Sequence, residues 1–310
     1  MALEVAAELY TRHMFTLGNV VDISITPSSR EEQFSRIRMG INGDLMGGMQ
    51  APIEVAKRRV DIGFVNPSAV VTMGYRGKAF YKEKLPIRAL ASFPSWDRMA
   101  FAVSKDLKVA SLADIRERKI PLRVSTRSSG VDNTTYYTVS KILSLYGFSF
   151  AHIKRWGGFV QESPRPTSPQ RIGGIKSGKI NAVFDEGLHN WVPDALKHGF
   201  EILSIEPGIL RQLEQMGYQR ATIPAGRYSN LEKDVETLDF SGWPLITHRW
   251  LPNEVAYAIC EAIDARQSVI PVDDDRPLDM KSLCRSSEAA PLGIPLHPGA
   301  KRYYEEKGYL

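Results

Sequence analysis

The chain has 310 residues, of which 43% are hydrophobic and 24% charged, a composition typical of globular domains. This length is sufficient for two domains. The formal net charge is +5, but Lys and Arg are spread along the chain and matched by Asp and Glu, which argues against a nucleic-acid-binding protein. No uninterrupted apolar run reaches eighteen residues, so the sequence predicts no membrane-spanning helix.

The N-terminal segment has apolar residues at helical spacing in residues 2–13, and residues 20–25 alternate like a strand. It lacks the basic flank and apolar core of a secretory signal peptide. We therefore expect no ordinary export signal in the chain as given.

Helical and strand patterns then alternate along the chain, which predicts mainly parallel sheets flanked by helices. Because this α/β rhythm occurs twice, we expect two similar lobes. Residues 155–169 and 271–277 are rich in turn-forming residues and are predicted to be exposed loops. The expected helices are 51–59 and 133–145, and the expected strands are 61–65, 87–92, 99–103, 122–125 and 181–184.

The chain must cross between the lobes, and the apolar strands 87–92 and 99–103 are the expected outward bridge. The return is expected near residues 221–239. This predicts a discontinuous first lobe, a continuous second lobe and a ligand cleft between them. The expected boundaries are 1–98 with 222–310 for the first lobe, and 99–221 for the second.

Residues 126–134 (TRSSGVDNT) follow a predicted strand and open a predicted helix. Free N–H groups at a helix start, serine hydroxyls and a planar guanidinium together suit a carboxylate ligand. The alternative is that Ser129 or Asp132 only caps the helix and that Arg127 points to solvent. The candidate ligand-binding residues of this turn are Arg127, Ser128, Ser129 and Asn133.

Two other predicted strand ends offer similar groups, and open α/β sheets bind ligands at the carboxyl ends of parallel strands. One of them carries Asn66 and Ser68, and the other carries Ser28 followed by Ser and Arg at 29–30. For the first, the alternative is an ordinary helix opening with Pro67 at the first helical position.

A third strand end places two acids, Asp185 and Glu186, next to each other. Such acids are able to bind an ammonium group or a hydroxyl, and the pKa of one rises if it is desolvated beside the other. The alternative is that one caps a helix while the other is solvated. Trp191 follows the acids and is the aromatic residue that we expect to line the cleft, although core packing is the common role of tryptophan.

Recognisable catalytic motifs are absent: the sequence has no serine-hydrolase elbow, zinc-protease helix signature or nucleotide-binding glycine loop. It therefore predicts no catalytic residues, no cofactor and no metal site. Cys260 and Cys284 form no metal-binding cluster, and whether they form a disulfide stays open.

Five segments carry a family resemblance: 222–228 (TIPAGRY), 296–308 (LHPGAKRYYEEKG), 87–94 (IRALASFP), 111–116 (SLADIR) and 174–184 (GIKSGKINAVF). Together they resemble the TAXI family, the solute-binding receptors of tripartite (TRAP) transporters. The resemblance implies a two-lobed type II periplasmic-binding-protein fold and a periplasmic location. Family members begin with a strand and a glycine-rich turn that this chain lacks, so we expect a late or truncated start and a pocket with one wall missing.

The leading hypothesis is a monomeric receptor that binds an amino acid or small organic acid and delivers it to TRAP membrane subunits. The alternative is a cytoplasmic enzyme on the same fold, a decarboxylase or lyase of a small acid, that uses Asp185 and Glu186. The paired acids and the absent export signal motivate this second hypothesis.

Overall fold

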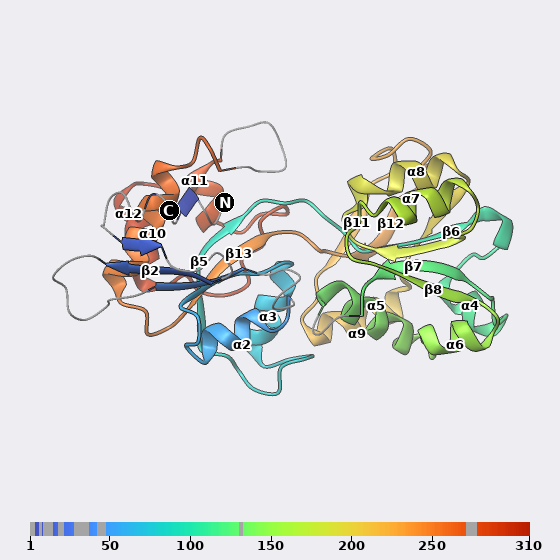
Figure 1. The fold of residues 1–310 in the computed structure, drawn as a ribbon, viewed down its shortest axis with the longest axis horizontal. Coiled ribbons are helices and arrows are strands. Elements are labelled where there is room, and N and C mark those ends of the chain that lie inside the picture. The colour runs from blue at the N-terminus through green and yellow to red at the C-terminus, as the bar shows by residue number, and fades with distance from the viewer. Residues whose placement is uncertain are drawn as a thin grey trace. The chain divides into compact units, whose positions relative to one another are not determined.

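The computed structural model describes residues 4, 5, 8, 15–17, 22–27, 37–41, 48–129, 133–270 and 278–310. The chain divides into two compact units (Figure 1). Unit 1 comprises Met1–Trp96 and Ser241–Leu310, and unit 2 comprises Asp97–Phe240. The chain therefore passes from one unit to the other twice, after Trp96 and after Phe240.

Unit 1 is built on a six-stranded sheet with the order β1-β2-β3-β4-β13-β5. Within this sheet only β3 and β4 pair in parallel, and the other neighbours are antiparallel. The strands are β1 (Phe15–Leu17), β2 (Asp22–Pro27), β3 (Ile37–Ile41), β4 (Ile62–Phe64), β5 (Ile87–Phe93) and β13 (Trp243–His248).

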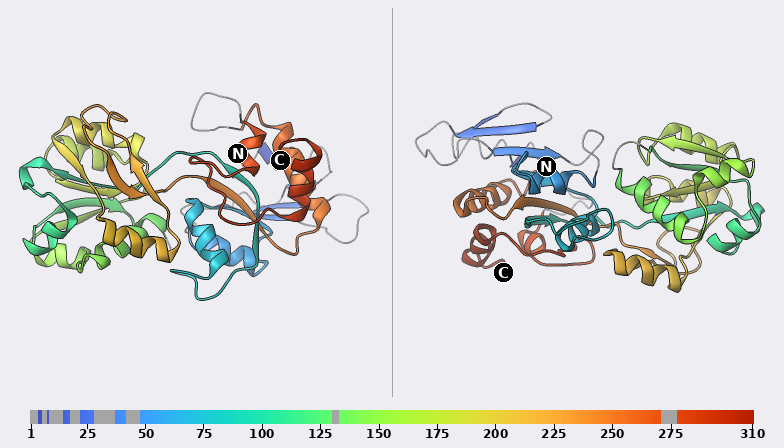
Figure 2. Two further views of the ribbon diagram at one scale, coloured as in Figure 1. Left: turned by 180° about the vertical axis from the view of Figure 1, so that it is seen from behind. Right: turned by 90° about the horizontal axis from the view of Figure 1, so that it is seen from below.

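The helices of unit 1 lie on both faces of its sheet. Figures 1 and 2 show α10, α11 and α12 on one face and α2 and α3 on the other. Their bounds are α2 (Ala51–Ala56), α3 (Ser68–Arg76), α10 (Asn253–Ala265), α11 (Met280–Cys284) and α12 (Pro298–Glu306).

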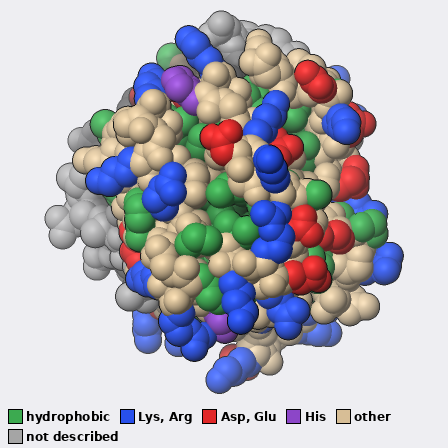
Figure 3. All heavy atoms as spheres, turned by 90° about the vertical axis from the view of Figure 1, so that its right-hand side faces the viewer, with side chains coloured by type: hydrophobic (Ala, Val, Ile, Leu, Met, Phe, Trp, Pro, Cys, Tyr) green, Lys and Arg blue, Asp and Glu red, His purple; other side chains and the backbone are tan. Residues whose placement is uncertain are grey.

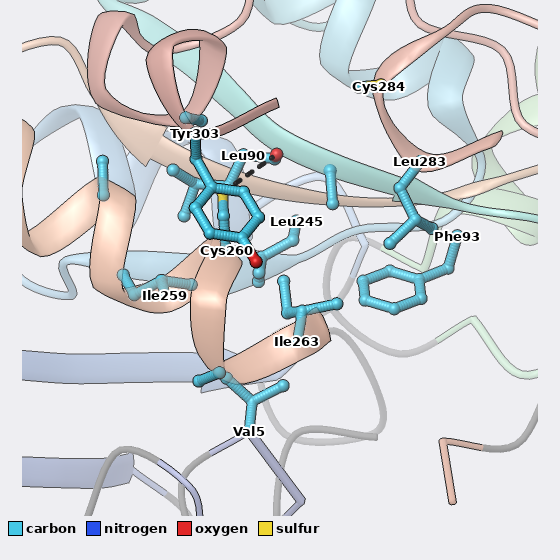
Figure 4. Close-up of a cluster of buried hydrophobic side chains, with 14 of the residues drawn as sticks. Val5, Leu90, Phe93, Leu245, Ile259, Cys260, Ile263, Leu283, Cys284 and Tyr303 are labelled. Atoms are coloured by element: carbon cyan, nitrogen blue, oxygen red, sulfur yellow. Dashed lines mark hydrogen bonds between the residues drawn. The ribbon is translucent and has the colours of Figure 1, made fainter. Parts of the chain in front are cut away.

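The main core of unit 1 lies between the sheet and helices α10, α11 and α12. Figure 4 shows side chains of β5 and β13 facing those of α10 and α12, among them Leu90, Leu245, Ile259 and Tyr303. The thiol of Cys260 donates a long hydrogen bond to the carbonyl oxygen of Leu90 at 3.8 Å. Apolar burial on this scale is the dominant stabilising contribution to such a unit.

Unit 2 is built on a five-stranded sheet with the order β10-β6-β9-β7-β8, accompanied by a separate hairpin of β11 and β12. The central strand pairs β7–β8 and β7–β9 are parallel, whereas β6 runs antiparallel to both of its neighbours. The strands are β6 (Ala100–Ser104), β7 (Arg123–Arg127), β8 (Phe159–Ser163), β9 (Ala182–Asp185), β10 (Phe200–Leu203), β11 (Arg220–Ile223) and β12 (Val235–Leu238).

The helices of unit 2 also cover both faces of its sheet. In Figure 1, α7 and α8 lie on one face, and α4, α5, α6 and α9 lie on the other. The bounds are α4 (Leu112–Glu117), α5 (Thr134–Leu145), α6 (Phe150–Arg155), α7 (Pro169–Lys176), α8 (Val192–Lys197) and α9 (Pro207–Met216), with short 3₁₀ turns at Lys105–Leu107 and Leu188–Asn190.

The predicted two-lobed α/β class is confirmed, but the prediction of mainly parallel sheets is wrong. Both sheets are mixed. The pairs β3–β4 and β7–β8, each joined through helices, are parallel, whereas β5, β6 and β13 flank the two crossings between the units and run against their neighbours.

Two sequence-based expectations about unit 2 differ from the structure. Strand β8 occupies residues 159–163, where an irregular loop was predicted; it is an edge strand, and its mostly half-exposed side chains give a weak apolar signal. The second crossing lies after Phe240, just beyond the expected range 221–239 and later than the expected boundary after residue 221, because β11 and β12 pair with each other within unit 2. Residues 271–277, the other predicted loop, lie outside the described residues.

None of the helices in the described ranges is both long and apolar enough to cross a membrane. On the face of the molecule shown in Figure 3, acidic and basic side chains are interspersed among apolar ones.

Candidate ligand-binding site

The candidate site lies at one edge of the sheet of unit 2. Strands β7, β8 and β9 are parallel, so their carboxyl ends meet at the same edge. The register places Arg127 of β7 opposite Ser163 of β8, and Thr126 opposite Phe184, one residue before Asp185. The turns after β7 and β9, predicted separately from the sequence, are therefore neighbours.

Arg127 is the cation of this edge. Its Nη1 lies 3.5 Å from Oε1 of Glu186, and the two side chains are 15% and 14% exposed. The Nε and Nη1 atoms of Arg127 are buried and have no hydrogen-bond acceptor among the described residues. Buried guanidinium donors normally find acceptors, so this group has unused capacity to bind an anion.

Glu186 is held in an environment that disfavours its charge. Burial raises the pKa of its carboxyl well above the ordinary value, and the negative charges of Asp97 and Asp185 raise it further, while Arg127 opposes them. These surroundings therefore favour the neutral form of Glu186 more strongly than water does.

Asp97 completes the cluster, although the sequence analysis did not identify it. Its Oδ2 accepts a hydrogen bond from the backbone N–H of Gly187 at 2.7 Å, and its Oδ1 accepts one from Leu188 at 3.3 Å. Its side chain is also hydrogen-bonded to that of Glu186. Burial raises the pKa of Asp97 despite these bonds. The available sequence signal was an acid next to the predicted outward crossing, which by itself does not indicate a site.

Asp185 lies inside unit 2 rather than on the surface of the site. Its Oδ2 forms an ion pair with Nη1 of Arg171, and both side chains are completely buried. Its Oδ1 accepts the backbone N–H of Glu186 at 2.8 Å, and Nε of Arg171 donates to Oγ of Ser125 at 3.0 Å. The expectation that Asp185 contacts a ligand is therefore not met by this geometry, since neither oxygen faces solvent.

The remaining residues of the turn after β7 are arranged around Arg127. The backbone N–H of Ser128 donates to Ser163, and the N–H and hydroxyl of Ser129 both donate to Oε2 of Glu162 at 2.8 Å. Asn133 caps α5, because its Oδ1 accepts the N–H of Tyr136 at 2.9 Å. The cap expected at Ser129 or Asp132 is thus supplied by Asn133, while Asp132 itself lies outside the described residues.

Trp191 supports the site from within. It is completely buried, and its Nε1 donates to the carbonyl oxygen of Glu186 at 2.9 Å. The indole therefore fixes the backbone that carries Glu186 and does not present a surface to a ligand, contrary to the expectation from the sequence.

The predicted candidates of unit 1 lie at the end of β4. Nδ2 of Asn66 donates to the carbonyl oxygen of Gly242 at 3.0 Å, and the N–H of Ser68 donates to Ser241 at 3.1 Å. Ser68 is the first residue of α3, and its hydroxyl is buried without a described hydrogen-bond partner. Ser28 and the two residues after it lie outside the described part of the chain.

Other features of the described residues are separate from this cluster. A cavity of about 330 Å³ in unit 2 lies beside β10 and residues 230–235, and no predicted ligand-binding residue lines it. Cys260 and Cys284 are buried free thiols. Within the described ranges, no group of three His, Cys, Asp or Glu side chains is arranged to hold a metal ion.

The profile of the NMT1-like family matches residues 28–308 of this sequence, which is most of its length. The chain belongs to the NMT1-like family. The match of this NMT1-like protein extends through both units and includes Asp97, Arg127 and Glu186.

Solved structures resemble the NMT1-like chain at low sequence identity. PhnD1 from Prochlorococcus marinus, in complex with methylphosphonate, is 9% identical over 99% of this chain and 83% of its own, with a TM-score of 0.41. The glycine/betaine/L-proline-binding protein ProX from Borrelia burgdorferi is 13% identical over 64% and 60%, with a TM-score of 0.37.

The alkanesulfonate-binding protein SsuA from Xanthomonas axonopodis pv. citri, bound to MOPS, is 11% identical over 72% of this chain, with a TM-score of 0.33. The match spans 62% of SsuA, which is less than two thirds of its length. At these TM-scores the likenesses do not identify a ligand for the NMT1-like protein.

Proposed function

We propose that this protein is a solute-binding receptor that captures a small carboxylate-bearing solute at the strand-end site of unit 2. The observation that carries the proposal is Arg127, whose buried Nε and Nη1 have no hydrogen-bond acceptor among the described residues. A guanidinium offers two parallel donors that match the two oxygens of a carboxylate, and such charge-assisted pairs are among the stronger polar contacts.

The surroundings of Arg127 support an anionic ligand. The hydroxyl of Ser128 belongs to the turn that follows the arginine, that of Ser129 donates to Glu162, and α5 begins a few residues later with the Asn133 cap. The start of this twelve-residue helix carries the positive end of the helix dipole. Amino acids and small organic acids are the solutes that fit these groups.

The contribution of unit 1 stays a prediction. Asn66 and Ser68 occupy a strand end there, as Arg127 does in unit 2. Replacing Ser68 by Ala and Asn66 by Ser is expected to weaken solute binding if these residues contact the solute, and to leave affinity unchanged if they only shape the start of α3.

We further propose that the membrane partner is a TRAP-type secondary transporter and that the receptor works in the periplasm. The support is the resemblance of segments 87–94, 111–116, 174–184, 222–228 and 296–308 to TAXI receptors. Reconstitution in proteoliposomes tests this: solute uptake should require both the receptor and its TRAP subunits. Uptake with the membrane subunits alone would contradict the assignment.

The receptor is favoured over the enzyme that the paired acids suggested. Asp185 is completely buried and engaged with Arg171 and the backbone of Glu186, so it is not placed to transfer a proton to a bound acid. Glu186 alone retains the partial exposure that a ligand contact requires.

The deciding experiment measures binding and turnover together. The purified protein is screened by thermal shift against acetate, pyruvate, succinate and L-glutamate, and each well is analysed by mass spectrometry. A solute that binds only the native state raises the melting temperature. Stabilisation with the solute unchanged is expected, whereas consumption of the solute would overturn the receptor proposal.

Variants then test the role of Arg127. Arg127→Gln should abolish the stabilisation, and Arg127→Lys should weaken affinity about tenfold or more, because lysine lacks the two-point donor geometry. Arg220→Gln is the matched control, since Arg220 is a half-exposed arginine of unit 2 paired with Glu214. Unchanged affinity in Arg127→Gln would contradict the assigned site.

A further inference from the structure

The strand-end site of unit 2 contains more carboxyl groups than guanidinium groups. Three acids, Asp97, Asp185 and Glu186, face two arginines, Arg127 and Arg171. With every group ionised, this cluster carries one excess negative charge. An anionic solute would not be expected to enter such a negatively charged cluster unless one of its carboxyl groups became neutral.

Glu162, whose Oε2 accepts the N–H and hydroxyl of Ser129, adds a further negative charge near the cluster. Arg98 is paired with Asp239 at 2.7 Å, and this ion pair is neutral as a whole. Tyr228 lies near Asp97, and both burial and that negative charge raise the pKa of its phenol, so it stays uncharged at neutral pH. Arg227 beside it is exposed.

Two of the three carboxyl groups are already committed to structural contacts. Asp185 pairs with Arg171, and Asp97 accepts the backbone N–H groups of Gly187 and Leu188. Glu186 is different, because none of the described backbone hydrogen bonds ends on its carboxyl group. It is the carboxyl that can change partner without breaking the fold.

The contact between Glu186 and Arg127 is loose. The closest atoms, Oε1 and Nη1, are 3.5 Å apart, and Nη1 makes no hydrogen bond to a described acceptor. On its other side Glu186 meets the carboxylate of Asp97, with which it shares a hydrogen bond. Two carboxyl groups share a hydrogen bond only when one of them carries a proton, so this bond belongs to the molecules in which Glu186 is protonated, whereas the ion pair with Arg127 belongs to those in which it is ionised.

We propose that Glu186 is the exchangeable counter-ion of Arg127, and that an anionic solute displaces it from the guanidinium while Glu186 takes up one proton. In this exchange the Glu186–Arg127 ion pair breaks, a solute–Arg127 pair forms, and a proton from solvent joins the Glu186 carboxylate. The neutral acid then donates its hydrogen bond to Asp97. The inference rests on the proposed function, since it requires that Arg127 binds the solute.

The raised pKa of Glu186 supports this exchange without establishing it. Burial and the charges of Asp97 and Asp185 already favour the neutral acid in the free protein. A bound anion beside Glu186 adds another negative charge. Because Arg127 is then paired with the solute, it stabilises the Glu186 carboxylate less. The pKa of Glu186 is therefore higher in the complex than in the free protein, and binding takes up a proton at any pH between the two values.

The sign of the proton exchange distinguishes solute classes. A carboxylate that displaces Glu186 causes proton uptake. A cationic group that binds Glu186 directly favours the ionised carboxylate and causes proton release. The proposal therefore commits the site to the carboxylate end of the solute, and not to an ammonium group.

The test is isothermal titration calorimetry with the tightest binder among acetate, pyruvate, succinate and L-glutamate. Titrations in phosphate and Tris buffers from pH 6 to 9 give the number of protons exchanged, because the two buffers have different ionisation heats. We expect binding to take up at most one proton per solute molecule. In the pH range where uptake occurs, the affinity should fall by at most about tenfold for each unit by which the pH rises.

Glu186→Gln is the decisive variant, since glutamine mimics the neutral acid. It should bind the same probe with no proton uptake and with affinity that no longer depends on pH. Glu214→Gln removes the same charge from an exposed position on α9 and should behave as the wild type. Circular dichroism melting checks that both variants are folded.

The outcomes separate the two proposals. Binding that depends on Arg127 but shows no proton uptake, or shows release, overturns the counter-ion exchange and leaves the receptor proposal standing. Unchanged pH dependence in a folded Glu186→Gln variant overturns it as well. Failure of every carboxylate probe to bind overturns the assigned solute class, and the counter-ion exchange with it.

Discussion

Arg171 on α7 and Asp185 at the end of β9 form an ion pair whose two side chains are both completely buried. The arginine also donates to Ser125 on β7, so this pair joins a helix to two neighbouring strands. It fixes the residue that precedes Glu186.

Removing one partner of this pair should destabilise unit 2 severely. Arg171→Met leaves Asp185 as an unpaired buried carboxylate, which costs about 3–5 kcal/mol in comparable cases. Lys176→Met is the matched control, because Lys176 on the same helix pairs with Asp194 while 51% exposed. The control should lose less than about 1 kcal/mol. Urea denaturation measures both, and equal losses would contradict the structural role of the buried pair.

The stability of the protein should depend on pH through Glu186. Its pKa in the folded protein is raised well above the ordinary value of 4.5, so the folded state binds the proton more tightly than the unfolded state. This contribution is fully present below about pH 4.5 and is lost as the pH rises through the folded pKa. The loss amounts to at most about 1.4 kcal/mol per pH unit.

Glu186→Gln should remove that loss. The free energy of unfolding of the variant, relative to the wild type, should therefore rise with increasing pH above 4.5. Denaturant melts at pH 5, 6, 7 and 8 measure this difference. A difference that stays constant over this range would show that Glu186 titrates normally in the folded protein.

Acid should destabilise unit 1 through His297. Burial lowers the pKa of this side chain from 6.5 to about 4, and the charges of His248 and Arg88 contribute. A base with a lowered folded pKa stabilises the fold above its unfolded pKa, and this stability is lost as the pH falls from 6.5 towards 4. The loss is at most about 1.4 kcal/mol per pH unit.

His297→Asn isolates this effect. His297 caps α12 by accepting the N–H of Gly299 at 3.2 Å, and asparagine is able to cap in the same way without titrating. The variant should lose less stability than the wild type between pH 6.5 and 4. His198→Asn, at an exposed position, is expected to follow the wild type.

Gly242 should not tolerate a side chain. Its φ of +82° is disfavoured for other residues, and an added Cβ would clash with Oγ of Ser68 and lie 3.0 Å from Cδ of Pro291. Gly178 has a similar φ of +70° but open space around it. Gly178→Ala should cost about 1 kcal/mol of conformational strain, and Gly242→Ala clearly more. Thermal melts of the two variants give the comparison, and equal losses would contradict the predicted clash.

Local patterns were sufficient for several helices and strands, among them α2, α5, β4, β7 and β9. The apolar spacing of 133–145 and the stop at Gly147 correspond to α5, which ends at Leu145, with Gly147 at a positive φ of 81°. The edge strand β8 was missed, because its side chains are mostly half exposed and their alternation is weak. The direction of the crossing strands was also missed, since strand direction depends on the path of the whole chain.

In the candidate site, too, some residues were predicted from local sequence and others were not. Arg127 and Glu186 were identified because strand-end turns have a recognisable local sequence, and the structure places their side chains in contact. Asp97 was missed, and Asp185 and Trp191 were expected to face a ligand although both are completely buried. Burial depends on which distant segments pack over a residue, and this information is not local.

The sequence by itself determined the α/β class and the residue types gathered at the strand ends, because periodicity, turn chemistry and motif spacing are local properties of the chain. Only the tertiary structure decided that Asp185 is neutralised by Arg171 and that Glu186 is left between Asp97 and Arg127. The physical reason is that charge pairing and desolvation depend on distances between atoms, and these partners are separated by many residues in the chain.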